Sequence, residues 1–168
     1  TGVESVGKFV KTDGYVFYTT LSYAANGLGI SGQYKRTNNF TFRADPFVAA
    51  NRGMINFLPP MGRVNTYRLT ARYAPATQEL DEQALQLDVR YALNKNLSFL
   101  VNISHIIRPE SEDHRDIYDE LYTQFTLKKP KKYTMIGGVQ LQRYDQELYQ
   151  GKAGAPIVHT VVPYIDYL

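Results

Sequence analysis

The stretch ALQLDVRYALNKNLSFLVNISHI, residues 84–106, decides the fold class. Apolar side chains occupy every second position before the central turn and again after it, with polar side chains between them. Asn94, Lys95 and Asn96 separate the two runs. Period-two alternation on both sides of a short polar turn predicts a β-hairpin with one apolar and one polar face.

The composition of the chain limits the classes of protein in which this hairpin can occur. The chain has 168 residues, enough for one domain with a sizeable core, and its lack of cysteine excludes disulfides and thiolate metal sites. It contains 14 Tyr and 8 Phe, yet its mean hydropathy is −0.36, which argues against a helical membrane protein and suits β-structure with one wet face. A net charge of +3 is too small to favour a nucleic-acid partner. The N-terminal segment shows no signal-peptide pattern.

Strand patterns recur along the rest of the chain, which we interpret as one unit, residues 1–168, without an internal boundary. With the opening hairpin they make eight strands, the others being residues 15–24, 28–35, 67–73, 117–128, 133–144 and 160–168. Asn26-Gly27 predicts a tight hairpin turn, and Pro163 indicates a strand end, an edge or a bulge. No segment has a convincing amphipathic helix pattern, although residues 46–58 could hold one helical turn.

The connections between these strands alternate in length. Tight turns are expected at residues 25–27, 94–96 and 129–132, and long connections at 38–65, 108–116 and 145–159. Short turns at one end and long loops at the other are typical of outer-membrane β-barrels. Residues 75–83 fall where a short turn is expected, so either residues 38–65 contain a further crossing or one tight turn faces outside. We favour the crossing, near residues 39–49, which gives eight to nine strands.

The two faces of the strands allow two readings. In a soluble β-sandwich the apolar face is the core, whereas in a membrane barrel it meets lipid and the polar face lines the lumen. Strands of about ten residues or more exceed the usual length of five to six and favour the barrel. Tyrosines also bracket apolar runs, as in an aromatic girdle. The girdle candidates are Tyr15, Tyr23, Tyr67, Tyr73, Tyr91 and Tyr133.

The alternation assigns individual residues to each face. The candidates for the lumen are Arg68, Arg72, Gln86, Asp88, Arg90, Asn102, Gln124, Gln140 and Gln142. The candidates for lipid contact are Leu85, Leu87, Val89, Phe99, Val101, Ile103, Val139 and Leu141.

Four segments resemble a large, functionally uncharacterised family of outer-membrane β-barrel proteins from Bacteroidota. They are GLGISGQYKR (27–36), FLPPMGRVNTYRLTARY (57–73), QELDEQALQLDVRYALNKNLSF (78–99) and MIGGVQLQRYDQELYQGKAGAP (135–156). The similarity runs from about residue 14 to residue 168 and carries no catalytic residues. It implies an antiparallel up-and-down transmembrane barrel in a Gram-negative outer membrane. Because family members are longer, with a signal peptide and further strands, it implies that this chain is an interior or late portion.

Motifs for catalysis or cofactor binding are weak. Gly27, Gly29 and Gly32 match G-x-G-x-x-G, but a strand pattern follows where the dinucleotide fingerprint needs a helix. We therefore expect no enzymatic activity, no cofactor and no catalytic residue. An oxygen-rich loop gives one weak cation candidate, comprising Glu110, Glu112, Asp113 and Asp116.

The sequence thus predicts a porin-like channel or transport protein of the bacterial outer membrane. Its partners would be outer-membrane lipid, lipopolysaccharide and other outer-membrane proteins in a complex, and not nucleic acid. The alternatives are a non-conducting structural or accessory subunit of a larger assembly and a soluble β-sandwich.

Overall fold

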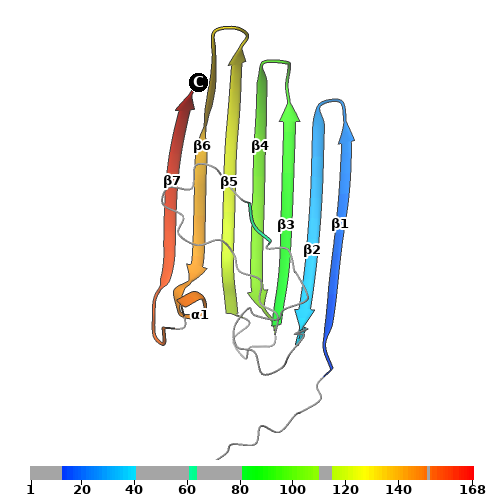
Figure 1. Ribbon diagram of the computed structural model, residues 1–168, viewed down its shortest axis with the longest axis vertical. Coiled ribbons are helices and arrows are strands. Elements are labelled where there is room, and N and C mark those ends of the chain that lie inside the picture. Colours follow the sequence, from blue (N-terminus) through cyan, green and yellow to red (C-terminus); the bar gives the residue numbers. More distant parts are fainter. Residues whose placement is uncertain (1–12, 41–60, 64–80, 110–114, 151) are drawn as a thin grey trace, which may run out of the picture.

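Seven strands and one short helix make up the regular structure in a computed structural model of the chain (Figure 1). The structure describes residues 13–40, 61–63, 81–109, 115–150 and 152–168. In chain order the elements are β1 (Tyr15–Ala25), β2 (Leu28–Asn38), β3 (Asp81–Ala92), β4 (Leu97–Arg108), β5 (Arg115–Lys129), β6 (Tyr133–Asp145), α1 (Gln146–Gln150) and β7 (Ile157–Tyr167).

All seven strands form one sheet in which spatial order equals sequence order and every neighbouring pair is antiparallel. This confirms an all-β, up-and-down architecture. The sheet is open, with β1 and β7 at its edges among the described residues, and it is consistent with a portion of a barrel. Pro163 pairs with Val139 from the edge strand β7, where a residue without an N–H is tolerated.

Tight turns join β1 to β2, β3 to β4 and β5 to β6 at one end of the sheet, and α1 lies at the other (Figure 1). Asn26 and Gly27 both have positive φ, 49° and 81°, as the expected tight hairpin requires. β2 pairs directly with β3, so no strand lies between them in the sheet. The expected strand at 67–73, the crossing near 39–49 and the helical turn at 46–58 lie outside the described residues.

A short helix that the sequence pattern does not indicate, α1, begins where the last residue of β6 ends. Asp145 caps it: the backbone N–H of Leu148 donates to Asp145 Oδ1 at 3.1 Å. Glu147 in the first turn adds a favourable charge at the helix N-terminus. A five-residue helix is too short to show a helical period.

The register across the sheet separates two faces. The polar face carries, among others, Ser31, Lys35, Gln86, Asn102, Glu120 and Gln140. The apolar face carries, among others, Leu21, Ile30, Val89, Phe99, Leu121, Val139 and Val161.

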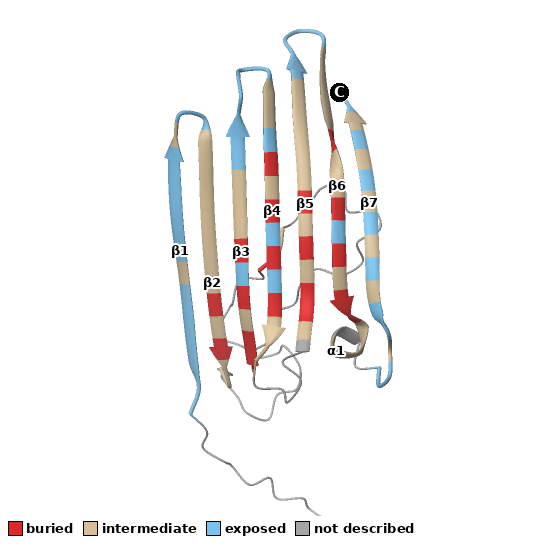
Figure 2. Ribbon diagram, turned by 180° about the vertical axis from the view of Figure 1, so that it is seen from behind, coloured by how far each residue is buried: buried red, intermediate tan, exposed pale blue. Residues whose placement is uncertain are grey.

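Many polar side chains of this sheet are buried and many large apolar ones are exposed, the opposite of the usual distribution in a water-soluble protein. Buried residues gather on the polar face, in the half of the sheet nearer α1 (Figure 2). An apolar cluster there packs under Leu148 of α1 and beside Val158, and its members are Met61, Ala84, Ile106, Ile117, Tyr118 and Tyr144. Large apolar-face side chains are exposed: Leu85 on β3 is 51% exposed and Phe99 on β4 is 44%, and on the edge strand β1 Leu21 reaches 77%.

Candidate functional site on the polar face

Two adjacent rows of polar side chains cross the polar face from strand to strand. One row is formed by the register partners Ser31, Asp88, Asn102, Tyr122 and Gln140. The next is formed by Gln33, Gln86, Ser104, Glu120 and Gln142. Because alternate residues of a strand share a face, the period-two pattern of the sequence produces these rows directly.

Glu120 organises the middle of the second row. Its Oε2 accepts hydrogen bonds from Tyr118 Oη (2.5 Å), Gln142 Nε2 (2.7 Å) and Gln140 Nε2 (2.8 Å). Its Oε1 accepts a weaker one from the backbone N–H of Arg63 at 3.3 Å. Glu120 itself is buried. Hydrogen bonds to a charged acceptor compensate much of the desolvation that a buried carboxylate suffers.

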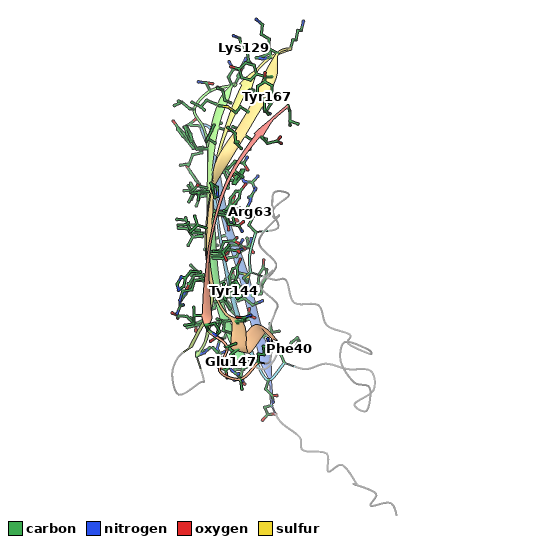
Figure 3. All side chains as sticks on the ribbon, turned by 90° about the vertical axis from the view of Figure 1, so that its left-hand side faces the viewer. Phe40, Arg63, Lys129, Tyr144, Glu147 and Tyr167 are labelled. Atoms are coloured by element: carbon green, nitrogen blue, oxygen red, sulfur yellow. The ribbon has the colours of Figure 1, made fainter. Side chains whose placement is uncertain are left out.

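Residues 61–63 lie against this face, on the opposite side of the sheet from the apolar side chains (Figure 3). Met61 is fully buried in the apolar cluster. The Arg63 guanidinium stacks over the Tyr122 ring, with Cζ 4.8 Å from the ring centroid. The segment therefore covers the polar face between the apolar cluster and the tight-turn end.

Asp88 lies between two arginines, Arg63 of that segment and Arg90 of its own strand. Arg90 Nε donates to Asp88 Oδ1 at 2.7 Å, and Arg63 Nη1 lies 3.4 Å from Asp88 Oδ2. Asn102 Nδ2 also donates to Asp88 Oδ2, at 3.3 Å. One carboxylate thus faces two guanidinium groups.

A cavity of about 700 Å³ opens beside these arginines at the tight-turn end. Small residues line much of it, among them Ala24, Gly29, Ala92 and Ser98. Among the described residues that line it, polar side chains come from Asn26, Arg63, Arg90, Tyr91, Ser98, Gln124 and Thr126.

On the polar face of β6 and β7, a tyrosine side chain crosses over a glycine. Tyr164 is the register partner of Gly138, and its hydroxyl donates to the Thr123 carbonyl on β5 at 2.9 Å. The same hydroxyl lies 2.5 Å from Tyr122 Oη, and the two rings stack with centroids 5.7 Å apart. Only a residue without Cβ leaves space for this crossing, because a Cβ on Gly138 would overlap the Thr123 carbonyl oxygen.

An ion pair is buried at the α1 end of the polar face. Lys35 Nζ lies 2.7 Å from Glu82 Oε1, and both side chains are fully buried. The pair joins β2 to β3 diagonally, since Lys35 is the register partner of Ala84 and Glu82 that of Thr37.

The apolar face ends in a charged belt on the same side as α1, formed by Arg36, Asp81, His105, Asp116, Asp119 and Arg143. Arg143 Nη1 lies 3.0 Å from both Asp116 Oδ2 and Asp119 Oδ2. His105 Nδ1 lies 2.5 Å from Asp119 Oδ1, and Arg36 pairs with Asp81. At the opposite end Tyr133 and Tyr167 stack with ring centroids 5.6 Å apart.

The residues chosen from the sequence fall on the two faces as follows. Gln86, Asp88, Arg90, Asn102, Gln124, Gln140 and Gln142 share the polar face. Leu85, Leu87, Val89, Phe99, Val101, Ile103, Val139 and Leu141 share the apolar face, as do Tyr15, Tyr23, Tyr91 and Tyr133. Arg68, Arg72, Tyr67 and Tyr73 lie outside the described residues, as do Glu110, Glu112 and Asp113.

The fourth member of the proposed cation loop, Asp116, pairs with Arg143. Within the described ranges no group of three or more His, Cys, Asp or Glu side chains is placed to hold a metal ion. Sequence reasoning missed Arg63, Lys35, Glu82 and Glu120. Arg63 lies in a loop without periodicity, and Glu82 falls in the connection expected at residues 75–83, whereas β3 begins at Asp81. Alternation assigns Lys35 and Glu120 to a face without revealing their burial.

A family model of proteins of unknown function, DUF6029, matches residues 2–167. The chain belongs to this family. Its match takes in all seven strands and the segment 61–63 that covers the polar face. The search of curated proteins and the search of solved structures each found no match. Among the described residues, no helix is both long and apolar enough to span a bilayer.

Proposed function

We propose that this DUF6029 chain is part of an outer-membrane β-barrel and acts as a porin-like channel or transport protein, with the polar face lining its lumen. The observation that carries the proposal is the inverted burial. The polar face holds buried, hydrogen-bonded groups, while large apolar side chains such as Leu21, Val161 and Ile165 are bare. In water this arrangement would be unfavourable, whereas in lipid the bare apolar face is the stable one.

The dimensions of the apolar face support a membrane. On β1 its residues run from Tyr15 to Tyr23, and eight steps of roughly 3.3 Å cover about 26 Å. The lipid-facing band of outer-membrane barrels is about 25 Å tall between aromatic girdles. The charged belt lies beyond the apolar residues, at the level where headgroups and lipopolysaccharide phosphates would meet it.

Conductance is the direct test. The intact protein is folded in detergent micelles, reconstituted into planar bilayers and examined for single-channel currents. We expect discrete conductance steps. Their absence from protein that has β-sheet circular dichroism and inserts into vesicles would refute the channel. Extraction of the native protein from cell membranes by buffer without detergent would refute the membrane location and favour the soluble sandwich.

A second candidate function, a non-conducting structural or accessory subunit of an outer-membrane assembly, is favoured by one observation. Residues 61–63 and α1 cover the polar face, and Met61 and Leu148 pack into one apolar cluster there. Such a cover would occlude a lumen. Replacing Met61 by Ser should loosen this cover. If the wild-type protein does not conduct and the Met61→Ser variant does, the lumen exists but is plugged. If both stay silent and the protein co-purifies with other outer-membrane proteins, the accessory function is supported.

A further inference from the structure

The cavity at the tight-turn end is cationic. Of the described residues that line it, the charged ones are Arg63 and Arg90. The acidic group in contact with them is Asp88, and its single charge is shared between two guanidinium groups. Arg63, Arg90 and Asp88 together carry one positive charge in excess, while the buried Glu120 carboxylate, which accepts from the backbone N–H of Arg63, does not line the cavity. The cavity volume of about 700 Å³ lies within the roughly 300–1,000 Å³ typical of small-molecule sites.

Both arginines keep donors for a ligand. A guanidinium carries five N–H donors, and Asp88 engages only part of them. Arg63 Nε is buried and has no hydrogen-bond partner, so a solute in the cavity would reach this guanidinium through its Nη groups. The contact of Arg63 with Asp88 is long, at 3.4 Å, whereas the Arg90 side chain is 66% exposed at the cavity wall.

The arginine under the cavity is held in position before any ligand arrives. Arg63 stacks on Tyr122, and its backbone N–H donates to the buried Glu120. Tyr122 is itself fixed by hydrogen bonds with Gln124 (2.7 Å) and Tyr164 (2.5 Å). A side chain ordered in this way loses little entropy on binding.

We propose that this cavity binds a small solute through an oxyanion, a carboxylate or a phosphate, held between Arg63 and Arg90. Guanidinium groups match the planar, paired oxygens of such anions and bind them in a bidentate manner. Asp88 competes with the solute for both arginines, so it sets the affinity and keeps the site occupied by a weak internal partner when the solute leaves. The inference rests on the proposed function, because it gives the charge class of what a lumen would select.

Binding is tested on the full chain in detergent micelles at low ionic strength by isothermal titration with inorganic phosphate and with succinate. We expect saturable binding of at least one of them. Arg90→Gln should weaken it about tenfold or more, as loss of one charge-assisted pair implies. Asp88→Asn should strengthen it, because the internal competitor is gone. The matched control is Arg143→Gln, which removes the same charge from the apolar face and should leave binding unchanged.

Two results would overturn the inference: no saturable binding by folded protein, or equal weakening by Arg90→Gln and Arg143→Gln, which would reflect net charge alone. Opposite effects of Asp88→Asn and Arg90→Gln on affinity cannot arise from misfolding, so a folding defect in one variant does not hide the answer.

Conductance separates this inference from the proposed function. In bilayers, the ratio of anion to cation permeability should fall in Arg90→Gln and rise in Asp88→Asn. Binding without conductance would refute the channel and keep the site. Conductance without binding would support the channel and refute the site.

Discussion

At the residue scale, Gly138 controls how closely β5, β6 and β7 approach on the polar face. Its missing Cβ lets Tyr164 reach over β6 to the Thr123 carbonyl. Gly138→Ala should therefore lower the free energy of unfolding by about 1–3 kcal/mol, the usual effect of overpacking. Urea denaturation in detergent micelles, followed by tyrosine fluorescence, measures the change.

Gly29→Ala is the matched control, because a Cβ at that strand position meets nothing within 4 Å. Alanine is also the better strand residue, so this variant should equal or exceed the wild-type stability. Equal losses from both substitutions would mean that the crossing by Tyr164 does not depend on the absent Cβ.

Lys35 and Glu82 give a second prediction at this scale. Replacing Glu82 by Leu leaves a fully buried ammonium without its carboxylate, which should cost about 3–5 kcal/mol of unfolding free energy. The double variant Lys35→Met with Glu82→Leu removes both charges and should recover most of that loss. The midpoint of urea denaturation measures the stability of each variant. A double variant no more stable than Glu82→Leu would contradict the pairing.

Single residues were the least predictable part of the site. Alternation correctly placed Asp88 and Asn102 together, because facing positions in neighbouring strands follow from the period of two. It could not indicate that Glu120 is buried under the backbone of Arg63, because depth depends on what covers the sheet. Arg63 itself follows Pro-Pro-Met-Gly, a stretch that suggests a loop and does not indicate which part of the sheet Arg63 contacts.

At the element scale, the strands were predictable and their ends were less so. Turn residues with a strong preference for positive φ, such as Asn26-Gly27, located the β1–β2 hairpin. The helix α1 was not predicted because five residues are too few to show helical periodicity, although Asp145 before Gln146-Glu147 is a capping signal. The uneven connection lengths became regular once β2 was found to pair with β3.

The membrane reading makes a prediction about β3 that depends on which way each residue points. Val89→Arg should destabilise the protein in bilayers by about 2–4 kcal/mol if this residue lies near the midplane. The next residue along the strand gives the contrast: Asp88→Asn should change folding little, since it faces the other side. Refolding yields and urea midpoints in lipid vesicles provide the measurement.

Because Val89 would also be core in a sandwich, stability alone does not separate the two readings. The chain has no cysteine, so single labels can be attached at Leu87→Cys, Val89→Cys and Phe99→Cys on the apolar face. Ser22→Cys and Arg90→Cys on the polar face serve as controls. Lipid-soluble quenchers should reach the first set and miss the second. Apolar-face labels shielded from lipid would refute the membrane location.

At the scale of the whole molecule, the edges of the sheet determine whether it can enclose a lumen. β1 and β7 each pair with one neighbour among the described residues, so every second backbone N–H of each strand points away from the sheet. In lipid, an unpaired backbone N–H costs several kcal/mol, and only a closed barrel leaves none. The polar face can enclose a lumen only if both edges are paired, whether by further chain or by another copy.

Hydrogen exchange of the intact protein in lipid vesicles tests this requirement. If the edges are paired, the outward amides of β1 and β7 should exchange within about one order of magnitude of those in β4, since all belong to one cooperative unit. β4 is the internal standard because it is hydrogen-bonded on both sides, to β3 and to β5. If the outward amides of β1 and β7 exchange at the rate of an unfolded peptide while β4 stays protected, the sheet is open in the membrane. An open sheet encloses no lumen, so the channel would then be excluded, whereas the oxyanion site, which needs only the sheet and residues 61–63, would remain to be judged by its own titration.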